Sequence, residues 1–147
     1  MQNAIGWTIL LLGGVLYLAQ VISSVSFSLA QRLGIQEDPA ESDSVLQTAE
    51  RFTAYWDLVT LGWLPLCGLL MIMDHHWWPI AGLIGGAIYL DASGREAFKI
   101  ISLRQEGFRL GTKRQQRVFF ASYIVMAMIG LGVAGYSIDA LMPQIGG

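Results

Sequence analysis

Four long apolar stretches, separated by charged segments, dominate this chain of 147 residues. A transmembrane helix needs about 20 apolar residues to cross the ~30 Å hydrocarbon core of a bilayer. Only 14% of the residues are charged and 54% are hydrophobic, whereas about 25% of the residues of a soluble domain are charged. The sequence therefore predicts an all-α, polytopic membrane protein in which four transmembrane helices form an antiparallel bundle within a single domain. The predicted spans cover about residues 4–30, 52–73, 77–98 and 118–142.

The third stretch is the least regular of the four. It is free of charge only from position 77 to position 90, which corresponds to about 21 Å of helix at 1.5 Å per residue. We therefore expect this helix to carry Asp91 into the inner leaflet, or the bilayer to thin around it. After it, residues 96–110 interleave apolar and basic positions, which predicts a short amphipathic, basic helical extension on the cytoplasmic side. Gly107 and Gly111 are candidate breaks in this extension.

The distribution of positive charge predicts the orientation. All nine Lys and Arg residues lie in or beside two segments, an acidic loop of residues 31–51 and a basic loop of residues 99–117. In a chain with four spans these loops share one side of the membrane, and both termini and the turn at residues 74–76 share the other side. The positive-inside rule then places the loops in the cytoplasm and both termini on the extracytoplasmic side of a plasma or inner membrane.

Small residues recur four positions apart in the third and fourth spans, a pattern that lets transmembrane helices approach closely. It predicts that both helices have close neighbours, and it leaves open whether these belong to the same chain, to a second copy or to other subunits. In the second span, Pro65 predicts a kink beside Gly62. The packing residues are Gly82, Gly85, Gly86, Gly130 and Ala134.

Several polar residues of the spans fall at similar depths, close to the cytoplasmic side, when depth is counted at about 1.5 Å per residue. Ionisable residues within a membrane are costly and usually face the protein interior or water, often in pairs. One interpretation is a cytoplasm-facing pocket, in which the aspartates carry protons, bind a cation or hold a polar headgroup, and the arginine holds an anionic group. The other is an interhelical hydrogen-bonded lock with no further function. This polar layer consists of Gln20, Asp57, Asp91, Arg95 and Ser122.

The turn between the second and third stretches holds Asp74, His75 and His76, which include the only histidines of the chain. Two imidazoles and a carboxylate are metal-ligand types, but adjacent residues do not share a helical face and the chain has no third histidine. We therefore predict a structural turn and no metal or cofactor site. The sequence contains no phosphate-binding glycine loop, nucleophile elbow or paired-cysteine motif, so it assigns no catalytic residue.

The basic segment after the third span has two interpretations. Each basic residue near the surface of an anionic membrane contributes about 1 kcal/mol of attraction, so the segment is suited to anionic lipids at the cytoplasmic face. Alternatively, it only sets the topology. A net charge of −2 argues against nucleic acid as a partner. The residues are Lys99, Arg104, Arg109, Lys113, Arg114 and Arg117.

Three classes of function remain open for such a protein. The lack of a catalytic motif and the small-residue helix faces favour a non-catalytic auxiliary, assembly or structural subunit of a larger membrane complex. A homo-oligomeric ion or proton channel or transporter would instead use Asp57 and Asp91. A membrane-embedded enzyme would act on a lipid headgroup at the cytoplasmic face. The expected partners are accordingly the bilayer and either other membrane subunits or further copies of the chain.

Overall fold

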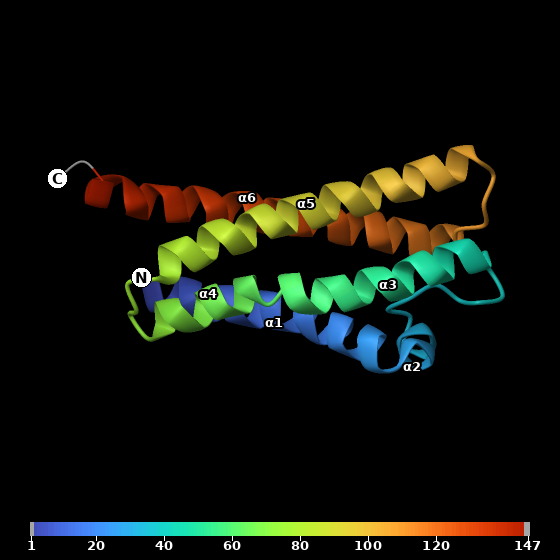
Figure 1. The fold of residues 1–147 in the computed structure, drawn as a ribbon, viewed down its shortest axis with the longest axis horizontal. Helices are drawn as coiled ribbons and strands as arrows, with labels where there is room; N and C mark the ends of the chain where they lie inside the picture. The colour runs from blue at the N-terminus through green and yellow to red at the C-terminus, as the bar shows by residue number, and fades with distance from the viewer. Residues whose placement is uncertain (1, 146–147) are drawn as a thin grey trace.

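The computed structural model describes residues 2–145, with side chains described for residues 2–142. This part of the chain is all-helical, as predicted, apart from an isolated antiparallel bridge between Ser42 and Leu110. The helices are α1 (Gln2–Val25), α2 (Phe27–Arg32), α3 (Ser44–Thr60), α4 (Trp63–Ile72), α5 (Trp78–Gln105) and α6 (Lys113–Ile145). All but the short α2 lie lengthwise, with α1 against α3 and α4, α4 against α5, and α5 against α6 (Figure 1).

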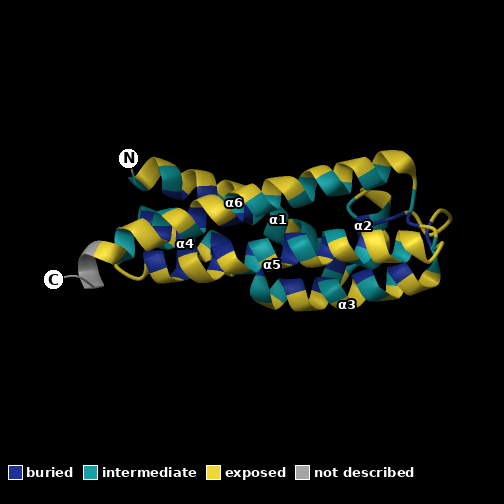
Figure 2. Ribbon diagram, turned by 90° about the horizontal axis from the view of Figure 1, so that it is seen from above, coloured by how far each residue is buried: buried dark blue, intermediate teal, exposed yellow. Residues whose placement is uncertain are grey.

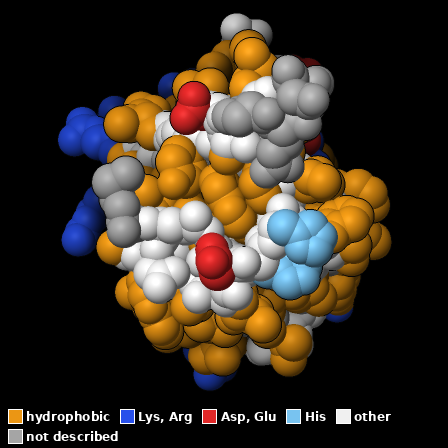
Figure 3. All heavy atoms as spheres, turned by 90° about the vertical axis from the view of Figure 1, so that its left-hand side faces the viewer, with side chains coloured by type: hydrophobic (Ala, Val, Ile, Leu, Met, Phe, Trp, Pro, Cys, Tyr) orange, Lys and Arg blue, Asp and Glu red, His pale blue; other side chains and the backbone are white. Residues whose placement is uncertain are grey.

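The two ends of the molecule differ. The N-terminus, the turn between α4 and α5, and the last turns of α6 lie at one end, whereas α2, the segment before α3 and the α5–α6 connection lie at the other (Figure 1). Figure 3 looks onto the first end. Hydrophobic side chains there surround the histidines and acidic side chains, and Lys and Arg side chains show only around the outline of the view (Figure 3).

Three helical segments are long and apolar enough to cross a membrane: Gln2–Val25, Ser44–Ile72 and Lys113–Met142. Large apolar side chains cover their outward faces, among them Val15 and Met128, which are 66% and 67% exposed. Exposed residues run along the whole length of the helices (Figure 2). An apolar exterior of this extent is expected where lipid is the solvent. The helix α5 is not in this group, and its second half carries the charged residues Arg95, Glu96, Lys99 and Arg104.

The second long segment is broken where Pro65 predicts a kink. α3 ends at Thr60 and α4 begins at Trp63, so the residues between them, Leu61 and Gly62, leave the regular helix. A proline has no amide hydrogen to donate to the preceding turn, but it is tolerated within the first turn of a new helix. Starting α4 just before Pro65 therefore leaves no hydrogen bond of α4 unmade.

Turn chemistry fixes the connection from α5 to α6. α5 is one continuous helix as far as Gln105, so the predicted basic extension belongs to it. Gly107 and Gly111 have φ angles of 83° and 77°, a left-handed backbone conformation that favours glycine. Both predicted breaks after the helix are therefore confirmed. α6 then opens with a capping box: Thr112 Oγ1 accepts from the amide of Gln115 at 3.2 Å, and Gln115 Oε1 accepts from the amide of Thr112 at 3.0 Å.

Glycines bring the backbones of α5 and α6 into contact. A methyl group at Gly86 would lie 2.7 Å from the carbonyl oxygen of Gly130 and 2.9 Å from the Cβ of Ala134. A methyl group at Gly85 would lie 3.0 Å from the amide nitrogen of Leu64 on α4. The close neighbours that the small-residue pattern predicts for the third and fourth stretches therefore belong to the same chain.

A second set of glycines, which the sequence analysis did not single out, joins α1 to α4. A methyl group at Gly68 would lie 2.5 Å from the amide nitrogen of Leu10, and one at Gly6 would lie 2.9 Å from the Cβ of Met71. The half of the molecule nearer the N-terminus is thus packed with helix backbones in contact. Larger spaces between the helices occur in the other half.

Candidate functional site

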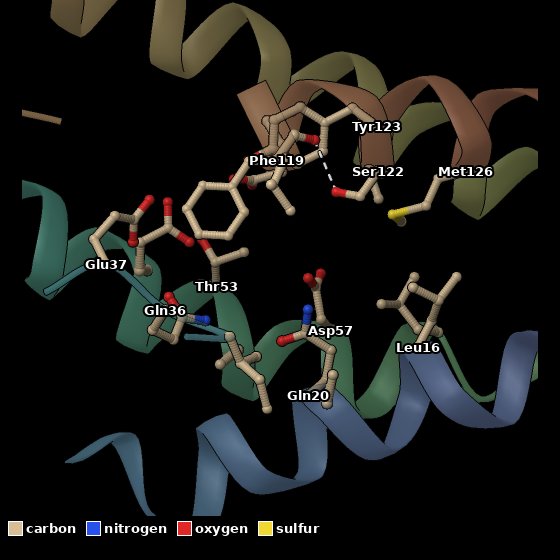
Figure 4. Close-up of a pocket in the computed structure, with 18 of the residues that line it drawn as sticks. Leu16, Gln20, Gln36, Glu37, Thr53, Asp57, Phe119, Ser122, Tyr123 and Met126 are labelled. Atoms are coloured by element: carbon tan, nitrogen blue, oxygen red, sulfur yellow. Dashed lines mark hydrogen bonds between the residues drawn. The ribbon is translucent and has the colours of Figure 1, made fainter. Parts of the chain in front are cut away.

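A cavity of about 250 Å³ with both apolar and polar lining residues lies between α1, α3, α5 and α6, in the half of the molecule that contains α2. Residues 34–37, in the segment between α2 and α3, also border it. Asp57 and Gln20 face Ser122 and Met126 across the open space (Figure 4). The polar residues of the lining are Gln20, Gln36, Glu37, Glu50, Thr53, Asp57, Glu96, Ser122 and Tyr123.

Acidic side chains outnumber basic ones around this cavity. Two of the acidic groups form ion pairs with Lys99, whose Nζ lies 2.8 Å from Glu50 Oε1 and also contacts Glu96. Asp57 Oδ1 accepts a hydrogen bond from Arg95 Nη2 at 3.1 Å. The fourth carboxylate, that of Glu37, has no basic partner within ion-pair distance among the described residues. Four carboxylates and two cations give the site a formal charge of −2.

These carboxylates are almost entirely withdrawn from solvent: Glu37 and Asp57 are 4% exposed, and Glu50 and Glu96 are 8% exposed. Burial raises the pKa of Glu37, more than its own backbone hydrogen bond and the charge of Lys99 lower it. For Lys99 burial lowers the pKa, but Glu50 and Glu96 more than offset this, so the pKa is raised above its ordinary value. Lys99 therefore stays charged, whereas the Glu37 carboxyl holds its proton more readily than an ordinary carboxyl does.

The structure brings the predicted polar layer together in part. Gln20, Asp57 and Ser122 line the cavity from α1, α3 and α6. Arg95 does not line the cavity; it borders the same outer groove as Asp91, reaches Asp57 from there and keeps about a third of its side chain exposed. Asp91 does not join them: it is exposed and lies in a separate groove with Trp56 and Thr60, on the outer face of α3 and α5. Arg95 is therefore paired between helices with Asp57 and, at 3.8 Å, with the adjacent Glu96, but not with Asp91.

Glu50 and Glu96 are functional candidates that the hydropathy pattern had assigned to the ends of spans and to loops. Helical spacing is the signal that identifies them. The buried positions of α3 are Leu46, Glu50, Ala54 and Asp57, so Glu50 lies two turns from Asp57 on the same face. On α5, Glu96 lies four residues after the buried Ala92 and four before the buried Ile100.

The six basic residues predicted to face lipid divide into two groups. Lys99 is held inside by its two carboxylates, and Arg109 is exposed but paired with Asp43. The other four are exposed and have no ion pair with the described residues. Charge patterning along the sequence does not separate these groups, because it does not show which basic residues have carboxylates across the helix interface.

The segment that borders the cavity is fastened to the α5–α6 connection. The amide of Arg109 donates to Asp43 Oδ2 at 2.7 Å and its Nε donates to Oδ1 at 3.1 Å, while the amide of Asp43 donates to the carbonyl of Arg109 at 3.0 Å. Asp43 is also the N-cap position of α3, and its side chain serves this contact instead of capping the helix. We call this contact the Asp43–Arg109 clamp.

The Asp43–Arg109 clamp predicts a pH-dependent stability. The hydrogen bond from the amide of Arg109, aided by its guanidinium, lowers the pKa of Asp43 below 3.8. A lowered folded-state pKa stabilises the fold above the unfolded pKa, and this contribution is lost as the pH falls through the folded pKa. We expect Asp43→Asn to lower the thermal midpoint by a few degrees at pH 7, and the difference from wild type to disappear as the pH falls through the lowered folded-state pKa of Asp43.

Thermal melts across this pH range measure the effect, with Glu41→Gln as the matched control. Glu41 is an exposed acidic residue of the same segment whose side chain has no hydrogen bond to the described residues. The control removes one negative charge and should leave the midpoint unchanged. A loss for Asp43→Asn that persists at the lowest pH would contradict the clamp.

The histidine turn has the geometry of a structural turn. His75 and His76 stack with their ring centroids 4.7 Å apart, and His75 Nδ1 accepts the amide hydrogen of Trp77 at 3.3 Å. Asp74 has a φ of 51° and accepts a hydrogen bond from Gln2 Nε2 at 3.2 Å, which ties the turn to α1. Among the described residues no three His, Cys, Asp or Glu side chains converge as metal ligands, at this turn or in the cavity.

The cavity therefore combines negative charge, hydrogen-bonding groups and the aromatic rings of Phe119 and Tyr123. Glu50 and Glu96 both contact Lys99, and Asp57 pairs with Arg95. Comparison of the chain with protein families, curated proteins and solved structures finds no match, so this chemistry is the basis for assigning a function.

Proposed function

We propose that this chain is an integral membrane protein that binds a small organic cation in the carboxylate-lined cavity, as the binding site of a cation transporter. The observation that carries the proposal is the formal charge of −2 within a buried space. Uncompensated buried charge is costly, because the interior solvates it poorly. A bound cation offsets that cost, whereas a neutral or anionic ligand does not.

The size and lining of the cavity favour an organic cation over a metal ion. A volume of about 250 Å³ is below the 300–1,000 Å³ typical of drug-sized ligands and well above the space of a single water. Phe119 and Tyr123 add aromatic faces, which attract ammonium groups. A quaternary or primary ammonium of a few carbon atoms matches both features.

The proposal includes four transmembrane spans, with both termini on the extracytoplasmic side. α5 has 28 residues, about 42 Å of helix, which exceeds the bilayer core. Glu96 and Lys99, which reduce its apolar character, are paired in the interior and do not face lipid, and this lowers the cost of placing them near the membrane. The positive-inside rule then sets the cavity toward the cytoplasm in an antiparallel arrangement of four helices.

The packing supports a site that is open on one side. Backbone contacts at Gly68 and Gly86 close the half of the molecule nearer the N-terminus, and the cavity lies in the other half. A transporter needs a polar site within the membrane that is reached from one side at a time. Because all walls of the cavity come from one chain, the binding site does not depend on a pore between protomers.

Calorimetric titration of the purified, detergent-solubilised protein tests the proposal. Tetramethylammonium and methylammonium should bind saturably, and tert-butanol, which is neutral and of similar size to tetramethylammonium, should not. Binding should weaken as the pH falls, because Glu37, with its raised pKa, loses its charge before ordinary carboxyl groups do. Absence of saturable binding for both cations, or equal binding of tert-butanol, would refute the proposed function.

A second candidate is the subunit of a larger membrane complex. It is favoured by Asp91, which is exposed on the outer face of α3 and α5 and has no hydrogen-bond partner among the described residues. An ionisable side chain at membrane depth normally has a partner. A helix of another membrane protein that carries a basic side chain would supply one. Extraction in a mild detergent should then recover a complex with a second protein species, and recovery of this chain alone would count against it.

A further inference from the structure

A groove of about 810 Å³ runs along the outer face of α5 and α6, at the end where these helices are connected. It is separate from the carboxylate-lined cavity and shares no lining residue with it. Three basic residues border it: Arg104 from α5, and Lys113 and Arg117 from the first turns of α6. Its floor includes Ile101, Ala121 and Ile124.

The positive charge of this groove is not neutralised by the described part of the chain. Neither Arg104 nor Lys113 nor Arg117 lies within ion-pair distance of a described carboxylate, in contrast to Lys99 and Arg109. Arg104 is nevertheless held in place. Its Nη2 donates to Gln116 Oε1 at 2.6 Å and its guanidinium lies 5.8 Å from the centroid of the Phe120 ring. The groove thus presents one guanidinium held in position and two further cations that have no ion pair with the described residues.

The apolar part of the groove lies on the side toward the membrane. With Trp78, the first residue of α5, placed at the outer boundary of a 30 Å hydrocarbon core, Arg104 lies 26 residues or about 39 Å further along the helix. It is therefore some 9 Å beyond the inner boundary of the core. Ile101 lies nearer to that boundary and Ile124 is 61% exposed, two turns further into α6 than Arg117. The cations therefore fall at the level of lipid headgroups, and the apolar floor falls at the level of the first acyl carbons.

We propose that this groove binds one acidic phospholipid, with the anionic headgroup on Arg104, Lys113 and Arg117 and an acyl chain along Ile101, Ala121 and Ile124. The positive end of the α6 dipole, which begins at Lys113, adds to the attraction for the phosphate. The apolar floor is the reason to assign a lipid and not a free phosphate. The proposal rests on the placement of this end of the molecule at the membrane surface, and it is independent of what the cavity binds.

Native mass spectrometry of the delipidated protein in detergent tests the site. The titrants are palmitoyl-oleoyl phosphatidylglycerol and phosphatidylcholine, which share their chains and differ in net charge. We expect the first phosphatidylglycerol to bind more tightly than phosphatidylcholine. Arg104→Gln combined with Arg117→Gln should weaken it about 20-fold or more, since about 1 kcal/mol for each basic residue corresponds to roughly fivefold.

The matched control combines Arg51→Gln with Arg114→Gln, which removes the same charge from exposed residues outside the groove. It should leave the preference intact. An equal loss in both double variants would show general electrostatic attraction only, and no preference in the wild type would show no site; either result overturns the proposal. Displacement of the lipid by millimolar glycerol 3-phosphate would also overturn it, because a headgroup alone would then suffice.

Discussion

Replacing Asp57 with Asn is expected to weaken cation binding at least tenfold and to abolish cation uptake by proteoliposomes. Asp57 is 4% exposed and its carboxylate lines the cavity. The substitution reduces the formal charge of the site from −2 to −1 and leaves the guanidinium of Arg95 without its partner at 3.1 Å. A lost interaction between charged groups in a buried site costs about 1.5–3 kcal/mol, which is at least a factor of ten in affinity.

Asp91→Asn is the matched control for this prediction. It makes the same chemical change at a neighbouring depth, but Asp91 is exposed and lies in the groove with Trp56 and Thr60, outside the cavity. Calorimetry and uptake should give wild-type values for Asp91→Asn. The cavity would be excluded as the binding site if Asp57→Asn bound the cation as tightly as wild type while keeping the wild-type thermal midpoint, or if both variants lost binding equally.

The contrast between Asp57 and Asp91 shows what the sequence can predict about such a site. Counting residues along a helix gives the height of each side chain in the membrane, and on that basis the two aspartates, Gln20 and Ser122 form one layer. Height does not give the direction of a side chain. Asp91 and Glu96 are five residues apart, which is a rotation of about 140° around the helix axis, and only Glu96 lines the cavity. Which face points inward depends on the neighbouring helices.

The burial and ion pairing of charged residues near the ends of the spans were the features least predictable from the sequence. A hydropathy pattern treats Glu50, Glu96 and Lys99 as the edge of a span or as loop, because each charged residue lowers the apolar average. In the folded chain these residues form a buried ion-paired group between α3 and α5. The helices themselves and their close approach at Gly82 and Gly86 were predictable, because they depend on local composition and spacing.

Polar and small residues divide the molecule in a way that explains both results. Where glycines face each other, the helix backbones approach closely and leave no cavity between them. Where carboxylates, amides and hydroxyl groups face inward, the helices are further apart and the space between them is the cavity. Stability and binding are therefore expected to depend on different residues. Substitutions at the glycine contacts should change stability more than binding, and substitutions in the cavity should change binding more than stability.

Gly86→Val is expected to destabilise the protein more than any surface substitution. The first added carbon already lies 2.7 Å from the carbonyl oxygen of Gly130 and 2.9 Å from the Cβ of Ala134. Neither neighbour is a flexible side chain, so α5 and α6 must separate. Overpacking of this kind typically costs about 1–3 kcal/mol and sometimes more. Thermal unfolding in detergent measures the loss.

Gly94→Val, on the same helix, separates the packing effect from helix propensity. A methyl group at Gly94 has no heavy atom within 4 Å among the described residues, so this control carries the conformational cost of valine without the clash. The corresponding alanine variants should shift the thermal midpoint in opposite directions. Alanine is favoured over glycine in a helix by about 1 kcal/mol, so Gly94→Ala should raise the midpoint while Gly86→Ala lowers it.

Cys67 provides a second readout that reports the packing directly. Its side chain is fully buried. A methyl group at Gly82 of α5 would lie 3.0 Å from its sulfur and 3.3 Å from Val133 of α6, so the thiol lies where α4, α5 and α6 meet. Separation of the helices by Gly86→Val should speed the reaction of Cys67 with a maleimide, and Gly94→Val should not. Equal midpoints and equal labelling rates for the two valine variants would mean that α5 and α6 are not in backbone contact at Gly86. The division between a packed half and a binding half would then fail.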